Sequence, residues 1–306
     1  MSEKYTEYSE QLLKAMKKND IDTLIKITIS EPLRERLKIN EKYLMVHGKE
    51  IFDDLKAFLK DDFRDLMVAL YTNKIEYDAQ QIYKALEKGE EEDDSLIELI
   101  VTRQGWRIEK IKKEYKNLYN MNLEKHIKEK TSGDFQNLLI SLIKVKRNEK
   151  DNVDIENCID MCKALKNIKE GNSQNKQDFY QYIASCSPLE LMTISRKYQD
   201  INNESIEQFI ESAFSGKIQN LIKAILLANL VPSQYFAHRI KDAVNNVGNK
   251  KNIFNRVIVT RNEIDIDIIG EYYKLKFEED MIEDINDSVD GDYQKLLCAL
   301  IKKNRF

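Results

Sequence analysis

Residues 131–139 read TSGDFQNLL and residues 289–297 read VDGDYQKLL, so the chain contains a Gly-Asp-aromatic-Gln-x-Leu-Leu pattern twice. The two glycines, Gly133 and Gly291, stand 158 positions apart. A Val-Thr-Arg triplet at 101–103 returns at 259–261 with the same offset. Two separate matches with one period indicate an internal duplication, in which residues 144–154 (KVKRNEKDNVD) join the two halves.

The helix of this pattern recurs inside each half, where it starts at Asp61 and at Gly216. From each of the four starting points, apolar residues follow at +2, +5, +6 and +9, which is the spacing of one helix face. These residues are Phe63, Leu66, Met67 and Leu70; Phe135, Leu138, Leu139 and Leu142; Ile218, Leu221, Ile222 and Ile225; and Tyr293, Leu296, Leu297 and Leu300. Thr131 and Ser132 are expected to cap the helix that follows them.

The spacing of the four starting points predicts four units of about 70 to 80 residues, each with five helices. We place these units at residues 5–72, 76–145, 152–230 and 232–303. Only 3 Pro and 9 Gly interrupt 306 residues, so long helices can form without a break. The predicted fold class is all-α, with four tandem repeats.

Charge and hydropathy limit the classes of partner. The 49 basic and 53 acidic residues give a net charge of −4, which gives no reason to expect nucleic acid as a partner. The polar start MSEKYTEYSEQ and the lack of a run of about 18 apolar residues predict neither a secretory signal nor a transmembrane segment. A cytoplasmic protein is expected.

The residues that usually carry chemistry are scattered. The four cysteines lack the paired spacing of a metal site, so we expect reduced thiols, mostly in the core. The three histidines have no evident Cys or Asp partner in the sequence, and no Gly-rich phosphate loop is present. The sequence therefore predicts that the protein is not an enzyme. Arg103 and Arg261, which end the two Val-Thr-Arg triplets, are expected to donate hydrogen bonds to helix ends in their own units.

The array of repeats resembles annexins. The stretches that carry the resemblance are DDSLIELIVTR (93–103), IKKEYKNLY (111–119), SGDFQNLL (132–139), NIFNRVIVTRNEIDIDII (252–269) and DGDYQKLL (290–297). The match covers the chain after about four residues and is more specific in units two and four than in units one and three. It implies a slightly curved α-helical disc that binds acidic phospholipid through calcium on its convex face. The divergent loops fit a protist branch such as the alpha-giardins.

The resemblance also implies where calcium would bind. In annexins a Lys-Gly-x-Gly-Thr loop between the first two helices and an acidic residue about 40 positions later supply oxygen ligands, of which calcium takes six to eight. Unit four places Ser288 at the acidic position, so Asp287 or Asp290 would have to replace it. The loop residues implied as ligands in unit four are Val244, Asn246, Gly248 and Asn249.

The other three units depart further from the annexin pattern. Unit two aligns Lys88-Gly89-Glu90-Glu91 with the loop and places Lys130 at the acidic position. Either Lys130 forms an ion pair with Glu90 or Glu91 in the vacant site, or residues 90–94 form a solvated helix start. Unit one offers Asp20 and Asp22, as calcium ligands or as N-cap residues, and has Phe58 at the acidic position. Unit three has Ala213 there, so its site is predicted to be lost.

The resemblance therefore implies calcium-modulated peripheral binding to an acidic, phosphatidylserine-like membrane surface through degenerate, low-affinity sites. Calcium is the expected cofactor, and the expected location is the inner face of the plasma membrane or the cytoskeleton. Lysines near the loops would add attraction to anionic lipid. The predicted lipid-binding lysines are Lys17, Lys18, Lys88, Lys130, Lys250 and Lys251. The alternative function is a calcium-independent helical scaffold that associates with cytoskeletal or other proteins.

Overall fold

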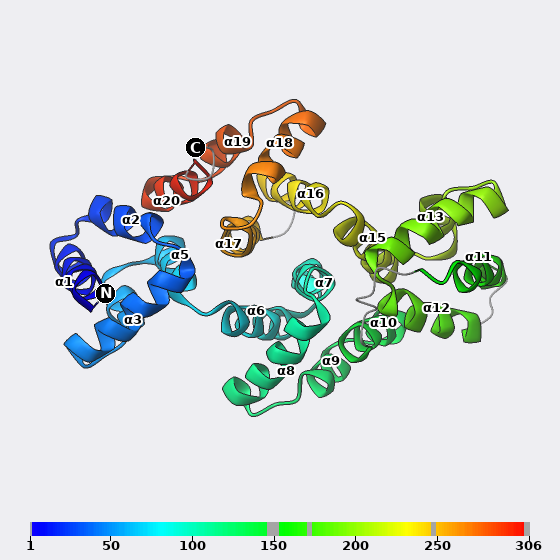
Figure 1. Ribbon diagram of the computed structural model, residues 1–306, viewed down its shortest axis with the longest axis horizontal. Helices are drawn as coiled ribbons and strands as arrows, with labels where there is room; N and C mark the ends of the chain where they lie inside the picture. The colour runs from blue at the N-terminus through cyan, green and yellow to red at the C-terminus, as the bar shows by residue number, and fades with distance from the viewer. Residues whose placement is uncertain (1, 146–152, 170–172, 246–248, 303–306) are drawn as a thin grey trace. The chain divides into compact units, whose positions relative to one another are not determined.

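The computed structural model of the chain describes residues 2–145, 153–169, 173–245 and 249–302 (Figure 1). Within these ranges the regular elements are helices and no strand is present, as the sequence predicted. Most of the predicted connection between the halves, residues 146–152, lies outside the described residues. None of the described helices is both long and apolar enough to cross a lipid bilayer.

The helices group into four repeats of five. Repeat 1 contains α1 (Ser2–Lys18), α2 (Ile21–Ser30), α3 (Leu33–His47), α4 (Ile51–Phe58) and α5 (Asp61–Tyr71). Repeat 2 contains α6 (Lys74–Lys88), the 3-10 helix η1 (Gly89–Glu92), α7 (Asp93–Val101), α8 (Gly105–Tyr119), α9 (Leu123–Lys130) and α10 (Gly133–Lys144). Repeat 3 contains α11 (Ile155–Lys169), α12 (Ser173–Ser185), α13 (Pro188–Asn202), α14 (Ile206–Ala213) and α15 (Gly216–Leu230). Repeat 4 contains α16 (Pro232–Val244), α17 (Lys250–Arg261), α18 (Ile266–Phe277), α19 (Met281–Ser288) and α20 (Gly291–Lys302).

The glycine of the repeated pattern makes the turn between the fourth and fifth helices. Gly133, Gly216 and Gly291 have φ of 62°, 62° and 65°, in the left-handed region that a residue without Cβ enters at little cost. Repeat 1 makes the same turn with Asp61, at φ 50°. Aspartate is one of the few other residues that tolerate this region.

The glutamine of the pattern ties the fifth helix to the end of the fourth. Gln136 Nε2 donates to the carbonyls of Lys128 (3.0 Å) and Thr131, and Gln294 Nε2 donates to the carbonyl of Asn286 (2.7 Å). These bonds satisfy carbonyls that a helix end leaves without an internal partner. The predicted cap was wrong in its chemistry: the Ser132 side chain makes no capping bond, and the Thr131 hydroxyl donates back to the carbonyl of Ile127.

The predicted apolar stripe of each fifth helix faces the core. Its members are buried, with the exception of Ile218, which is half-buried. Each of two fifth helices packs against the second helix of another repeat: α5 of repeat 1 contacts α17 of repeat 4, and α15 of repeat 3 contacts α7 of repeat 2. The four cysteines are free and buried in the same core, as expected.

Two compact units result, and they cut across the sequence halves. Unit 1 comprises residues 1–77 and 236–306, so it joins repeat 1 to repeat 4. Unit 2 comprises residues 78–235, which are repeats 2 and 3. In unit 1, α5 packs against both α17 and α20, and these helices lie next to each other in Figure 1 (cyan, orange and red). The two compact units therefore do not coincide with the two halves of the sequence duplication.

Candidate calcium and membrane site

Repeat 4 presents two exposed carboxylates beside the position of the missing acidic ligand. Asp287 and Asp290 are exposed at the turn between α19 and α20. Ser288, between them, donates its hydroxyl to the carbonyl of Asp284 (2.7 Å) and so satisfies its own helix. Of the predicted loop ligands, Asn246 and Gly248 lie outside the described residues, Val244 ends α16, and Asn249 caps α17 by accepting from the Asn252 N–H (3.3 Å).

These residues fit calcium only in part. Calcium requires six to eight oxygens, and the described residues contain no group of three acidic, histidine or cysteine side chains arranged to hold a metal. Asp287 and Asp290 could each supply a carboxylate oxygen, and the remaining ligands would have to come from backbone carbonyls and water. The donor set suits a weak site.

Repeat 1 does not fit calcium. The Asp20 carboxylate accepts from the Thr23 N–H (3.1 Å) and the Thr23 hydroxyl (2.8 Å), which caps α2 and lowers the pKa of Asp20. The loop closes tightly, because the Asp20 N–H donates to the carbonyl of Ala15 (2.9 Å). Asp22 is exposed in the first turn of α2, and Phe58, 43% exposed, stands at the acidic position. The capping interpretation of Asp20 accounts for its contacts.

Repeat 2 has a lysine, Lys130, at the position of the acidic calcium ligand. This lysine forms an ion pair, but with a different glutamate from the ones expected. Lys130 Nζ lies 2.9 Å from Glu87 Oε1, at the end of α6, and does not pair with Glu90. Glu90 Oε1 instead lies 2.7 Å from Lys217 Nζ of repeat 3, which also contacts Asp93 (2.8 Å). The sequence interpretation missed these partners because Glu87 precedes the loop and Lys217 is 127 positions from Glu90.

A buried histidine extends this network. His126 is 1% exposed, and its Nε2 lies 3.0 Å from Glu87 Oε1 while its Nδ1 lies 2.6 Å from the Tyr115 hydroxyl. Hydrogen bonds from Lys130 and His126 lower the pKa of Glu87, and the Lys130 bond is the largest cause. This arrangement does not suit calcium, since the Glu87 carboxylate is already paired with the ammonium group of Lys130. In repeat 3, Ala213 brings no oxygen, and residues 170–172 of the loop lie outside the described residues.

The six predicted lipid-binding lysines divide into two groups. Lys130, Lys251 and Lys88 are engaged in ion pairs, with Glu87, with Asp62 of α5 and with Glu92, respectively. Lys17 and Lys18 are exposed in the last turn of α1, and Lys250 is half-buried at the start of α17. The first group already has carboxylate partners within the protein, which leaves Lys17, Lys18 and Lys250 as the better candidates for contact with lipid.

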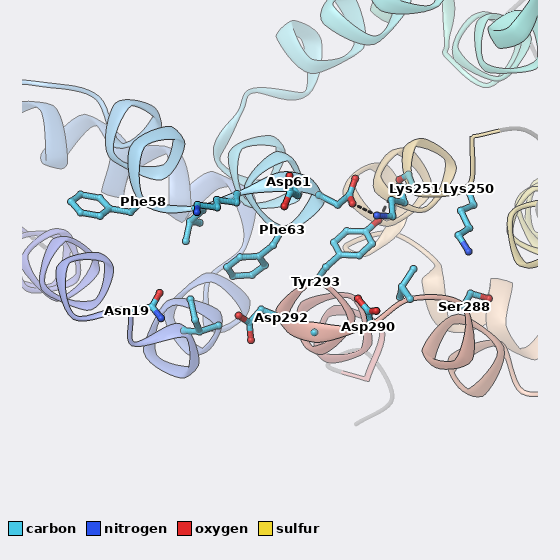
Figure 2. A pocket seen from close by; sticks show the side chains of 16 residues that line it. Asn19, Phe58, Asp61, Phe63, Lys250, Lys251, Ser288, Asp290, Asp292 and Tyr293 are labelled. Atoms are coloured by element: carbon cyan, nitrogen blue, oxygen red, sulfur yellow. Dashed lines mark hydrogen bonds and ion pairs between the residues drawn. The ribbon is translucent and has the colours of Figure 1, made fainter.

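A pocket of about 610 Å³ lies in unit 1 between the loop of repeat 1 and the α19–α20 turn of repeat 4 (Figure 2). We call it the repeat 1–4 pocket. It brings together Asn19, next to Asp20, and three residues of the repeat 4 site, Lys250, Ser288 and Asp290. Sequence reasoning missed this pocket, because it treated each repeat as a separate site.

The fold and the loop positions define an annexin-type array of five-helix repeats, and comparison with known proteins agrees. The family model for annexins matches residues 7–70, 77–142, 161–225 and 235–300. Human annexin A13 is 31% identical over 280 residues, which cover 91% of this chain and 88% of that protein. Annexin A13 of the dog, Canis lupus familiaris, is 30% identical, with 96% and 94% covered.

Solved structures show the same fold. Annexin III aligns with a TM-score of 0.92 at 28% identity, covering 97% of this chain and 93% of that one. A calcium-bound alpha-14 giardin aligns with a TM-score of 0.82 over 97% and 99% of the two chains, at 18% identity, which shows the fold alone. The chain belongs to the annexin family, whose members are known for calcium-dependent binding to phospholipid.

Proposed function

We propose that this annexin binds anionic phospholipid surfaces peripherally and reversibly, with calcium acting through repeat 4 at low affinity. The observation that carries the proposal is the pair of exposed carboxylates, Asp287 and Asp290, of which Asp290 lines the same pocket as Lys250 and Lys251 at the start of α17. Repeats 1 to 3 do not contribute calcium sites in this proposal, since Asp20 is a cap, Lys130 brings a positive charge to the acidic position of repeat 2 and Ala213 has no side-chain oxygen. Such a protein would work at the cytoplasmic face of a membrane.

Calcium and lysine would make separate contributions to binding. A calcium ion held by Asp287 and Asp290 would keep coordination positions for lipid phosphate, with an expected dissociation constant of about 10⁻⁴ to 10⁻³ M. Lys17 and Lys18 attract an anionic leaflet without calcium, by about 1 kcal/mol each near the surface, and salt screens this attraction. We therefore expect weak, salt-sensitive binding in chelator and stronger binding in calcium.

Sedimentation with vesicles tests this proposal. Wild-type protein should pellet with phosphatidylserine vesicles at millimolar calcium and pellet less in chelator. Asp287→Asn with Asp290→Asn should remove the calcium increment and leave the chelator-resistant fraction. Lys17→Gln with Lys18→Gln should lower affinity by about 30-fold in both conditions, the equivalent of about 2 kcal/mol. No pelleting at millimolar calcium and low salt would refute the proposal.

A second candidate function, association with a protein scaffold such as a cytoskeletal filament, is favoured by apolar residues exposed on third helices. Met45 of α3 is 77% exposed and Leu275 of α18 is 81% exposed, and both stand 16 residues before the start of the fifth helix. Cosedimentation with actin filaments or microtubules in chelator tests this function. Met45→Ser with Leu275→Ser should abolish cosedimentation, and an unchanged pellet would count against these residues.

A further inference from the structure

The repeat 1–4 pocket has features that neither the lysines nor the carboxylates of a calcium site require. We propose that it binds a headgroup that carries both a phosphate and an ammonium group, as in phosphatidylethanolamine or phosphatidylserine. This inference rests on the proposed membrane binding and names the ligand that unit 1 would select there. The pocket volume of about 610 Å³ is in the range of small-molecule sites and leaves ample room for such a headgroup.

Units 1 and 2 differ in the ion pairs that join a fifth helix to the second helix of the other repeat. In unit 2 both crossings between a fifth helix and the second helix of the other repeat are bridged by lysine: Lys217 to Asp93 (2.8 Å) and Lys176 to Asp134 (3.8 Å). Unit 1 has one such bridge, between Lys251 and Asp62. At the other crossing, α20 against α2, the residue after the turn glycine is Asp292 where repeat 3 has Lys217.

The reversed charge at Asp292 prevents the second bridge. Asp292 pairs with Lys295 of its own helix (3.2 Å) and does not reach across to α2, whose first residue, Ile21, lines the same pocket. Among the described residues of unit 1, no ion pair joins α20 to α2, and Asp292 lines the pocket. An open space lined by charged groups is a suitable site for a polar ligand of matching charge.

The charges that line the pocket match a zwitterion. Asp61, Asp290 and Asp292 supply carboxylates, and Lys60 and Lys250 supply ammonium groups that can bind phosphate. Figure 2 shows Asp290 and Asp292 along one side of the pocket, with Lys250 at one end of the view. An ammonium group can bind to these carboxylates, of which Asp290 is shared with the calcium site proposed for repeat 4, so the titrations below are made in chelator.

Aromatic side chains add to the site for the ammonium group. Phe63 and Tyr293 line the pocket and are 8% and 6% exposed. Tyr293 is held by hydrogen bonds from its hydroxyl to Asn255 Oδ1 (2.8 Å) and to the carbonyl of Lys251 (3.3 Å). An ammonium group over an aromatic ring gains attraction from the ring's electron-rich face.

The mouth of the pocket favours a lipid over a free headgroup. Phe58, at the position where an annexin site would have a carboxylate, lines the pocket at one end of the view in Figure 2 and is 43% exposed. An exposed phenyl ring offers a free phosphate ester neither a charge nor a hydrogen bond. It would contact the glycerol and acyl region of a lipid whose headgroup sits in the pocket.

The first experiment uses soluble probes and does not depend on membrane binding. Calorimetric titrations in chelator compare dihexanoyl phosphatidylethanolamine below its micelle concentration, phosphoethanolamine, dihexanoyl phosphatidylglycerol and inorganic phosphate. We expect phosphoethanolamine to bind at least tenfold more tightly than inorganic phosphate, and the short-chain phosphatidylethanolamine to bind more tightly still. Phe58→Ala should remove only the advantage of the short-chain lipid over phosphoethanolamine. Equal affinity for the ethanolamine and glycerol lipids would overturn the inference.

The decisive variant is Asp292→Lys, which gives α20 the residue that repeat 3 has at Lys217. The pocket inference predicts at least a tenfold loss of phosphoethanolamine affinity. General electrostatic attraction predicts the opposite for anionic vesicles, since the variant replaces a negative charge with a positive one. Glu271→Lys is the matched control, because Glu271 is exposed on α18 outside the pocket. It should leave phosphoethanolamine binding unchanged.

Asp61→Gly is a second variant, chosen because glycine suits the backbone at this turn and the fold should be kept. It removes one carboxylate and should weaken phosphoethanolamine binding at least threefold. Vesicle arms separate the two proposals. If wild-type protein pellets equally with phosphatidylglycerol vesicles that contain phosphatidylethanolamine or phosphatidylcholine, membrane binding stands and the pocket inference fails. If the protein pellets with none of the vesicles but binds phosphoethanolamine, and Asp292→Lys abolishes that binding, the pocket inference is supported and the proposed membrane binding is refuted.

Discussion

A fully buried carboxylate in repeat 2 gives the sharpest test of what holds the fold together. Asp78 is 0% exposed and accepts from Arg103 Nε (3.1 Å) and Nη2 (2.8 Å), and Arg107 Nε adds a bond of 2.7 Å. Arg103 is the arginine of the first Val-Thr-Arg triplet, and its side chain is 3% exposed. The sequence predicted that Arg103 binds helix ends within its own repeat. The Asp78 partner does lie in the same repeat, but it is a side chain and not a helix end.

The expected magnitude follows from burial. Asp78→Ala leaves the Arg103 guanidinium without its counter-charge in a place that water does not reach, which costs about 3 to 5 kcal/mol. The second triplet provides the matched control. Arg261 pairs with Asp265, and these side chains are 17% and 15% exposed, so solvent can replace the lost partner. Asp265→Ala should cost about 1 to 2 kcal/mol.

The assay is equilibrium unfolding in urea, followed by far-ultraviolet circular dichroism, with the free energy of unfolding taken by linear extrapolation. Asp78→Leu combined with Arg103→Met should recover most of the loss, because it removes the buried Arg103 guanidinium together with its partner, while Arg107, with 16% of its side chain exposed, can reach solvent. If the losses in free energy of unfolding caused by Asp78→Ala and by Asp265→Ala differ by less than about 1 kcal/mol, burial does not set the strength of these ion pairs.

Three further outcomes are expected. Asp61→Gly should raise the free energy of unfolding by about 0.5 to 1 kcal/mol, since glycine relieves the left-handed turn at φ 50°, and an unfolding midpoint at or below that of wild type would contradict this reason. Burial is the largest cause lowering the pKa of His238 below its ordinary 6.5, so the unfolded chain takes up the proton first and stability falls as pH drops from about 7 to about 5. His238→Gln should flatten this fall in urea titrations at several pH values, and an unchanged slope would exclude His238. Burial raises the pKa of Cys162 to about 11 and that of Cys186 further, so a thiol reagent should label the native chain far more slowly than the urea-unfolded chain, and equal rates would contradict their burial.

The repeated pattern shows how far local sequence can lead. The fifth-helix stripe depends on neighbours a few positions away, so periodicity predicts it. The number of helices per repeat follows from the same local rules. The role of the glutamine was missed, because the carbonyls it binds belong to the preceding helix, whose end only the structure fixes.

The candidate site was predictable only in part. Sequence alignment with the annexin pattern located the α19–α20 turn and the loss of acidic ligands at Lys130 and Ala213. It could not assign Lys130 to Glu87 or Lys217 to Glu90, because a charged side chain pairs with whichever opposite charge the fold brings within about 4 Å.

The sequence by itself determined that this chain is four five-helix repeats of the annexin family, since helix periodicity, turn residues and duplication are properties of short stretches. Only the tertiary structure decided that repeat 1 packs with repeat 4 and repeat 2 with repeat 3, against the order of the duplication. It also decided that lysine bridges join the helices at both crossings in unit 2, while in unit 1 Asp292 lines a pocket. The physical reason is that ion pairing and cavity shape depend on distances between residues far apart in the chain, which periodicity does not encode.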